Sequence, residues 1–130
     1  MIYSLLVLSP PCSGHGARTA ATFAHTLLAR GHQIYRVFFL DAGTEAGLST
    51  AVYPQDEADR LQPWIDLAQK HGVELVLCIS SALKHGVLDE GESRRYEKIG
   101  PTAHPAFTVS GLGQLHDAAA HSDRLITFGG

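Results

Sequence analysis

A chain of 130 residues is long enough to bury a hydrophobic core but too short to be expected to hold a second domain, so one domain over 1–130 is predicted. Its 45% hydrophobic and 18% charged residues exclude a disordered chain and are typical of a globular protein. The net charge of −3 leaves no large electrostatic footprint for nucleic acid, so direct RNA or DNA binding is not expected.

The amino-terminal segment is apolar, but it predicts a strand and not a targeting signal. It lacks a basic region, and Pro10 and Pro11 interrupt it within a few residues. No run approaches the roughly 18 apolar residues that a membrane span needs. We therefore expect a cytoplasmic protein with no membrane partner. Two cysteines, Cys12 and Cys78, are too few for a disulfide framework and lack C-x-x-C spacing, so either would act as a free thiol.

The first part of the chain predicts the order strand, helix, strand. Residues 2–8 form a continuous apolar run of the kind found in buried parallel strands, followed by the turn signal "SPPCSGHG". From Thr19 onward apolar residues recur on one helical face, and Gly31 is a suitable stop. Residues 33–40 are again strand-like, being rich in aromatic and β-branched residues. Residues 41–60 show no sustained period, which predicts a long loop with at most one short helical turn.

The middle of the chain repeats this alternation. Residues 61–72 carry apolar side chains at helical spacing, and 73–79 are a third strand-like run. A short helix is predicted directly afterwards, over 80–86, with Ser80 or Ser81 as its N-cap because serine is a favoured capping residue.

The last part adds one more helix and two strands. Residues 87–106 are charged, contain prolines and glycines and lack a period, so a second long loop is predicted. A strand, a helix and a closing strand are then expected at 107–110, 111–123 and 124–128. Strands that alternate with helices imply right-handed βαβ units and a parallel sheet covered on both faces.

Three side chains with possible chemistry lie at or just after the carboxyl ends of predicted strands: Cys12, Cys78 and Ser110. Ligands and catalytic groups collect at the carboxyl ends of parallel strands. Cys78 also precedes a helix start, where backbone N–H groups and the helix dipole can lower a cysteine pKa from about 8.5 to roughly 3.5–7.5. A persulfide anion would be held by the same groups. From position alone, core packing is the more usual explanation, because free cysteine is among the most buried residue types.

The other candidates are weaker. The glycine-containing turn "SPPCSGHGART" can in principle cradle a phosphate, which leaves a flavodoxin-like phosphate- or nucleotide-binding module as an alternative, but it matches neither common nucleotide motif. Ser110 in "VSGLGQL" fits a helix N-cap better than a serine-hydrolase elbow. Lys84 and His85 can place positive charge near a Cys78 thiolate or simply be solvated helix-end residues. The eight histidines show no zinc-site spacing.

Three segments together resemble the DsrE/TusD sulfurtransferase family of small sulfur-relay proteins: "GHQIYRVFFLDAG", "HGVELVLCISSALKHGVLDEGE" and "FTVSGLGQLHDAAAHSDRLITFGG". Their order and spacing agree with the family over nearly the whole chain. The resemblance implies an α/β fold, a single-domain three-layer sandwich with a central, mainly parallel five-stranded sheet and helices on both faces.

The resemblance also implies an activity. Cys78 matches the family's strand-cysteine-helix motif and would be the catalytic residue, accepting sulfane sulfur as a persulfide and passing it on without a metal or organic cofactor. Cys12 departs from the family pattern and is given no catalytic role.

The partners implied are an upstream persulfide donor, a TusE/DsrC-type sulfur acceptor, and paralogous TusB/TusC-like or DsrF/DsrH-like subunits in a heterohexamer. The pathway would be 2-thiolation of a tRNA wobble uridine in the TusD branch or cytoplasmic sulfur oxidation in the DsrE branch. A non-catalytic structural subunit of the same assembly, with Cys78 merely packed, is the alternative.

Overall fold

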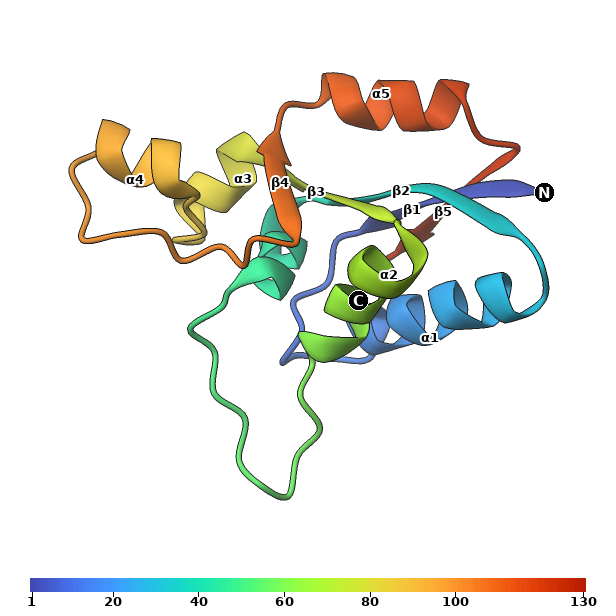
Figure 1. Cartoon of the computed structure of the whole chain (residues 1–130), viewed down its shortest axis with the longest axis horizontal. Coiled ribbons are helices and arrows are strands. Elements are labelled where there is room, and N and C mark those ends of the chain that lie inside the picture. The colour runs from blue at the N-terminus through green and yellow to red at the C-terminus, as the bar shows by residue number, and fades with distance from the viewer.

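Five parallel strands form one sheet in the order β4-β3-β2-β1-β5, as the computed structural model of residues 1–130 shows (Figure 1). Every neighbouring pair in the sheet is parallel, so the predicted five-stranded parallel sheet is confirmed. The strands are β1 (Ile2–Val7), β2 (Gln33–Phe39), β3 (Glu74–Cys78), β4 (Phe107–Ser110) and β5 (Arg124–Phe128).

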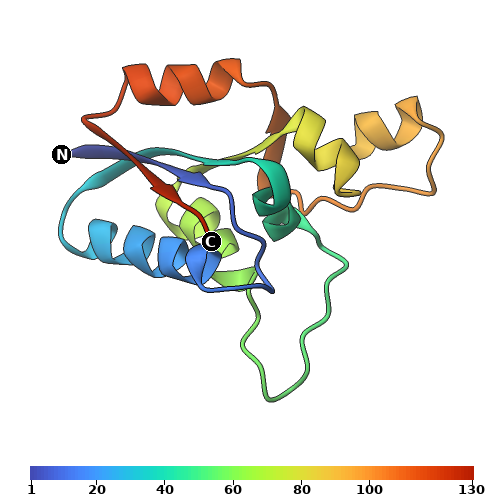
Figure 2. The same cartoon turned by 180° about the vertical axis from the view of Figure 1, so that it is seen from behind.

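Helices cover both faces of the sheet, which confirms the three-layer arrangement. Helices α1 (Gly16–Ala29) and α2 (Gln62–His71) lie on one face, and α5 (Gly113–Ala120) lies on the other (Figures 1 and 2). Three short elements lie beyond the carboxyl ends of the central strands: the 3-10 helix η1 (Asp41–Gly47), α3 (Ile79–Lys84) and α4 (Glu90–Arg95). None of the helices has the length and apolar content that crossing a membrane would require.

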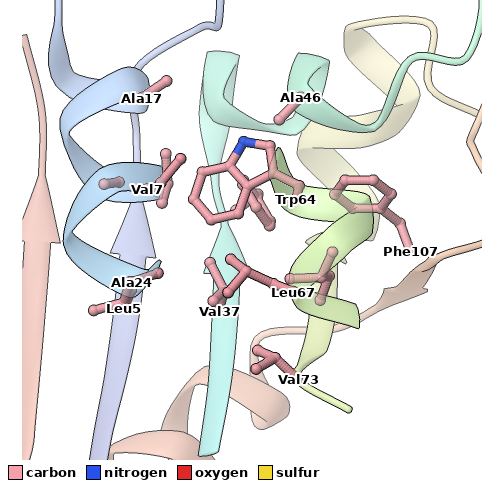
Figure 3. Close-up of a cluster of buried hydrophobic side chains, with 14 of the residues drawn as sticks. Leu5, Val7, Ala17, Ala24, Val37, Ala46, Trp64, Leu67, Val73 and Phe107 are labelled. Carbon is pink, nitrogen blue, oxygen red and sulfur yellow. The ribbon is translucent and has the colours of Figure 1, made fainter. Parts of the chain in front are cut away.

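The larger part of the core lies between the sheet and the α1/α2 layer (Figure 3). Because side chains alternate along a strand, every second residue of the three central strands points to this side. Trp64 of α2 is 1% exposed and packs edge-on against Phe39, with ring centroids 5.0 Å apart. The strand residues in this cluster are Leu5, Val7, Ile34, Val37, Phe39, Leu75, Leu77 and Phe107.

The opposite face of the sheet packs against α5 and contains a buried charge. Arg36 of β2 is 5% exposed, and its Nη1 donates to Asp117 Oδ2 at 2.9 Å and to the Gln114 carbonyl at 2.8 Å. Its Nη2 donates to Glu74 Oε2 at 3.0 Å. These bonds compensate much of the cost of burying the guanidinium and fix α5 to the amino-terminal half of the central strands. Towards the carboxyl ends the same face is apolar, with Phe38, Val76 and Cys78 clustered together.

The predicted boundaries hold for the strands and fail at two helices. The single helical turn expected within 41–60 is η1, but the loop predicted over 87–106 contains α4. Six residues are too few to show a helical period, although Asp89 caps α4 by accepting the N–H of Glu92 at 2.8 Å. The N-cap of α5 is Leu112 and not Ser110, which is the last residue of β4.

Candidate functional site

The structure brings Cys78 to the carboxyl edge of the sheet, as predicted, and pairs its Cα with that of Ser110 on β4. Cys12 lies elsewhere. It follows β1, which β2 separates from β3, and its exposed Sγ donates to the hydroxyl of Tyr53 at 3.7 Å. Adjacent strands lie roughly 4.8 Å apart, so about two strand spacings separate β1 from β3. Both cysteines are free thiols.

Cys78 is both the last residue of β3 and the N-cap of α3, so the prediction that Ser80 or Ser81 caps this helix was wrong. The switch occurs at Cys78 itself because its backbone is still extended, at φ −62° and ψ 121°, while Ile79 is already helical. A side chain at an N-cap is directed at the unpaired N–H groups of the first helical turn. The chain therefore places a sulfur atom where an N-terminal helix turn favours an anion.

The Cys78 thiol is 1% exposed and yet polarised. Its Sγ lies 3.4 Å from Ser80 Oγ. Burial on its own raises the pKa of the Cys78 thiol, but the Ser80 hydroxyl and the N–H and hydroxyl of Ser81 outweigh it, so the pKa lies below its ordinary value. The Cys78 side chain makes no capping hydrogen bond to the backbone of α3. Its interaction with the N–H groups of the first turn is therefore strongest when the sulfur carries a negative charge. The site favours the thiolate, the nucleophilic form of cysteine.

Ser81 links the site to the neighbouring strand end. The backbone N–H of Asp41, the first residue after Leu40 at the end of β2, donates to Ser81 Oγ at 2.9 Å. Asp41 has φ +52°, a left-handed conformation that residues other than glycine rarely adopt, and the Thr44 hydroxyl holds its carbonyl at 2.8 Å. This role of Asp41 is not predicted by the sequence, in which Asp41 begins a predicted loop; only its position directly after a strand points to the site.

The far end of α3 is tied to η1 as well. His85 Nδ1 lies 2.8 Å from Glu45 Oε2, so the two short helices are held together at both ends. His85 thus has a partner other than Cys78, and neither it nor Lys84 is among the groups that shift the Cys78 pKa. The hydroxyls and backbone N–H groups of Ser80 and Ser81, and not these two side chains, lower the pKa of Cys78.

The turn "SPPCSGHGART" is filled by the chain's own carboxyl-terminal glycines. Ser9 Oγ donates to the Gly130 carbonyl at 3.0 Å. A Cβ added at Gly14 would lie 2.6 Å from that same carbonyl oxygen. Carbonyl oxygens repel a phosphate, so the geometry disfavours the nucleotide-binding alternative. No group of three or more His, Cys, Asp or Glu side chains comes together in the chain in a way that could hold a metal ion.

Comparison with known proteins agrees with this architecture. The model of the DsrE/DsrF-like family matches residues 1–128. The chain is 40% identical over 130 residues to the sulfurtransferase TusD homolog of Pseudomonas aeruginosa, covering 100% of this chain and 98% of the relative. It is 39% identical to sulfurtransferase TusD of Serratia proteamaculans, covering 97% and 98% of the two chains.

DsrE of Allochromatium vinosum is 36% identical over 129 residues, with 99% of both chains covered. The crystal structure of the ychN protein of E. coli superposes with a TM-score of 0.74 over 97% of both chains at 15% identity, which shows a shared fold. A family match over nearly the full length, together with relatives at 36–40% identity, shows that this chain belongs to the DsrE/DsrF-like family.

Proposed function

We propose that this protein is a sulfurtransferase that carries sulfane sulfur as a persulfide on Cys78. The sulfurtransferase activity rests on the relatives, of which the TusD proteins of P. aeruginosa and S. proteamaculans are named for it. The choice of residue rests on one observation: Cys78 ends β3 and caps α3, so its sulfur meets the hydroxyls and N–H groups of Ser80 and Ser81.

The proposed reaction consists of two displacements at sulfur. The Cys78 thiolate attacks the outer sulfur of a donor persulfide, a new S–S bond forms at Cys78, and the donor leaves as a thiolate. An acceptor thiolate then attacks the outer sulfur, and Cys78 leaves as a thiolate. Each step breaks one S–S bond and forms another, so no oxidant or reductant is consumed. A lowered pKa makes Cys78 the better leaving group in the second step.

The first turn of α3 stabilises Cys78 both as a thiolate and as a persulfide. The groups that stabilise the Cys78 thiolate also stabilise the terminal sulfur anion of a persulfide, because dipoles at an N-terminal turn favour negative charge irrespective of the atom that bears it. Ser80 is exposed, while Cys78 is not, so a partner reaches the sulfur from the side of Ser80. That both states of the carrier have the same stabilising groups supports a residue that alternates between them.

The partners follow from family membership and are part of the proposal. We expect paralogous subunits in a heterohexamer, an upstream persulfide donor, and a TusE/DsrC-type protein as acceptor, in the cytoplasm, where thiols stay reduced. The two branches of the family leave two destinations, tRNA wobble-uridine thiolation and sulfur oxidation. Relatives named TusD and DsrE are similarly close to this chain, at 40% and 36% identity, so the comparisons favour neither destination.

Mass spectrometry after incubation with a persulfide donor tests the carrier role. The wild-type chain and Cys12→Ser are expected to gain the mass of one sulfur atom that a reductant removes, and Cys78→Ser is expected to gain none. Peptide mapping should locate the added sulfur on Cys78. A gain on Cys12 alone, or no gain in the wild type, contradicts the proposal.

A structural subunit is the second candidate, because Cys78 is 1% exposed and packs with Phe38 and Val76 as a core residue would. In that case Cys78→Ala should preserve assembly with the paralogous subunits and also preserve sulfur transfer by the complex. Under the carrier hypothesis the same variant assembles normally but the complex no longer transfers sulfur. Measuring both assembly and sulfur transfer of the variant complex therefore separates the two candidates.

A further inference from the structure

An apolar groove with two cationic side chains lies at the carboxyl-terminal end of α3. It has a volume of about 660 Å³. Its apolar lining includes the side chains of Leu83, Leu88, Tyr96 and Ile99. Tyr96 is 48% exposed and Ile99 is fully exposed. A fully exposed isoleucine beside a half-exposed tyrosine is a contiguous apolar surface of the kind that marks an interaction site.

The fold builds this groove rigidly. Helix α4 ends in a Schellman motif, in which the N–H of Lys98 donates to the Ser93 carbonyl at 2.9 Å and that of Glu97 to the Arg94 carbonyl at 3.1 Å. Glu97 takes φ +55° there, which turns the chain back towards α3. Thr102 closes the base, because its hydroxyl accepts the Leu88 N–H at 2.9 Å and donates to the Gly86 carbonyl.

The charged side chains that line the groove have one sign. Lys84 and Lys98 both line it, no carboxylate does, and neither lysine takes part in an ion pair. Glu90 and Glu92 on α4 are paired with Arg94 and Arg95 on that helix, and Glu97, exposed between Tyr96 and Lys98, forms no ion pair. A ligand complementary to this groove carries an apolar side chain flanked by negative charges. An acidic, amphipathic protein segment has this pattern.

The groove is also close enough to the thiol to orient a partner. Leu83 lies five residues after Cys78 on the same helix, which is about 8 Å along the axis at 1.5 Å per residue. A protein anchored there can extend a cysteine-bearing segment over the first turn of α3, past the exposed Ser80. An anchor at that distance raises the effective concentration of the incoming thiol at Cys78.

We propose that this groove is the docking surface for the sulfur-acceptor protein and that it takes an acidic segment with an apolar side chain at its centre. This inference rests on the proposed function, since it assumes that Cys78 passes sulfur to another protein. It adds the surface and the chemistry of the contact: Tyr96 and Ile99 hold the apolar side chain, and Lys84 and Lys98 pair with the carboxylates.

Binding of the purified TusE/DsrC-type protein, used as the probe, tests the groove. The chain is assembled with its paralogous subunits and carries either a charge reversal or an apolar-to-acidic substitution. Lys98→Glu and Ile99→Asp are expected to weaken probe binding about tenfold or more, and to slow sulfur transfer to it correspondingly. Rising salt should weaken the wild type and not Lys98→Glu. Matched controls are Lys70→Glu and Val52→Asp, at exposed positions away from the groove, which should bind as the wild type does.

The outcomes separate this inference from the proposed function. Both groove variants should still load one sulfur from a small-molecule persulfide donor, because loading does not use the groove. If the wild type fails to load, the carrier role falls. If it loads but does not bind the probe, the docking inference falls and the carrier role stands. The inference is overturned if both variants bind the probe with wild-type affinity. It is also overturned if the variants dissociate from the subunit assembly, because the groove is then a contact between subunits.

Discussion

The backbone N–H of Asp41 donates to the hydroxyl oxygen of Ser81 at 2.9 Å, and so joins the end of β2 to the first turn of α3. Because that oxygen is occupied as an acceptor, the hydroxyl proton is free to be donated to the sulfur of Cys78, whose pKa Ser81 lowers. The backbone amide of Asp41 thereby leaves the Ser81 hydroxyl proton available to the candidate nucleophile.

Ser81→Ala is therefore expected to raise the Cys78 pKa and to destabilise the fold by about 1–3 kcal/mol, because it removes the thiolate's donor and leaves the N–H of Asp41 without its partner. The pH dependence of thiol alkylation measures the first effect and urea unfolding the second. Ser110→Ala, beside Cys78 on β4, is the control and should leave the pKa in place. An unchanged pKa in Ser81→Ala would show that the amides alone stabilise the thiolate.

The depressed pKa of Cys78 has a consequence for stability. Between the lowered folded-state pKa and the ordinary value of about 8.5, the folded chain holds a thiolate while the unfolded chain still holds a thiol. The unfolded state then binds more protons, so the free energy of unfolding rises with pH through this window. Above it the contribution is complete, and as pH falls through the folded-state pKa it is lost.

Chemical denaturation from pH 6 to 9 checks this, with Cys78→Ser as the reference, since serine does not titrate there. The difference in unfolding free energy between the wild type and the variant should grow with pH. A constant difference would mean that the folded and unfolded pKa values are equal.

Gly43 of η1 has no room for a side chain, since an added Cβ would lie 2.2 Å from the Val7 carbonyl oxygen. Gly43→Ala is expected to cost about 1–3 kcal/mol of stability and to displace η1, which carries Asp41. Gly111→Ala is the matched control, because a Cβ there meets nothing within 4 Å. Thermal unfolding compares the two, and equal melting temperatures would contradict the tight packing of η1 on β1.

Glu97 ends α4 in a left-handed conformation that glycine adopts without strain. Glu97→Gly is expected to stabilise the chain by up to about 1 kcal/mol, whereas Arg95→Gly, inside the same helix, should destabilise it by about as much. Calorimetric unfolding measures both. A loss of stability in Glu97→Gly would indicate that the glutamate side chain makes a contact in solution that outweighs the strain.

Much of the architecture could be predicted because its signals are local and periodic. Continuous apolar runs marked the strands, and the change of period marked α1 and α2. Short elements gave no such signal: α4 has six residues, less than two helical turns, and only its capping Asp89 distinguishes it from a loop. The N-cap of α3 was misassigned for a related reason, since serine is the commoner capping residue and two serines follow Cys78.

The sequence predicts where Cys78 lies in the fold but not which groups contact its sulfur. Topology placed Cys78 at the carboxyl edge of the sheet, because each strand end leads into a loop there. The contacts that polarise its sulfur depend on the backbone of Asp41, 37 positions earlier in the chain, and on the orientation of two hydroxyls. Hydrogen bonds between segments so far apart in sequence leave no pattern in one chain. The same holds for the groove, whose walls come from α3 and from the segment after α4.

The near-complete burial of Cys78 has a consequence for which molecules react with it. Under the proposed function, a sulfur atom bound to a thiol that is 1% exposed reacts slowly with glutathione and other small molecules, although a long incubation still loads or reduces it. A partner protein that stays bound next to Cys78 has more time to react than a small molecule that collides and leaves. Burial therefore favours delivery of the sulfur to slowly dissociating proteins over its loss to small thiols.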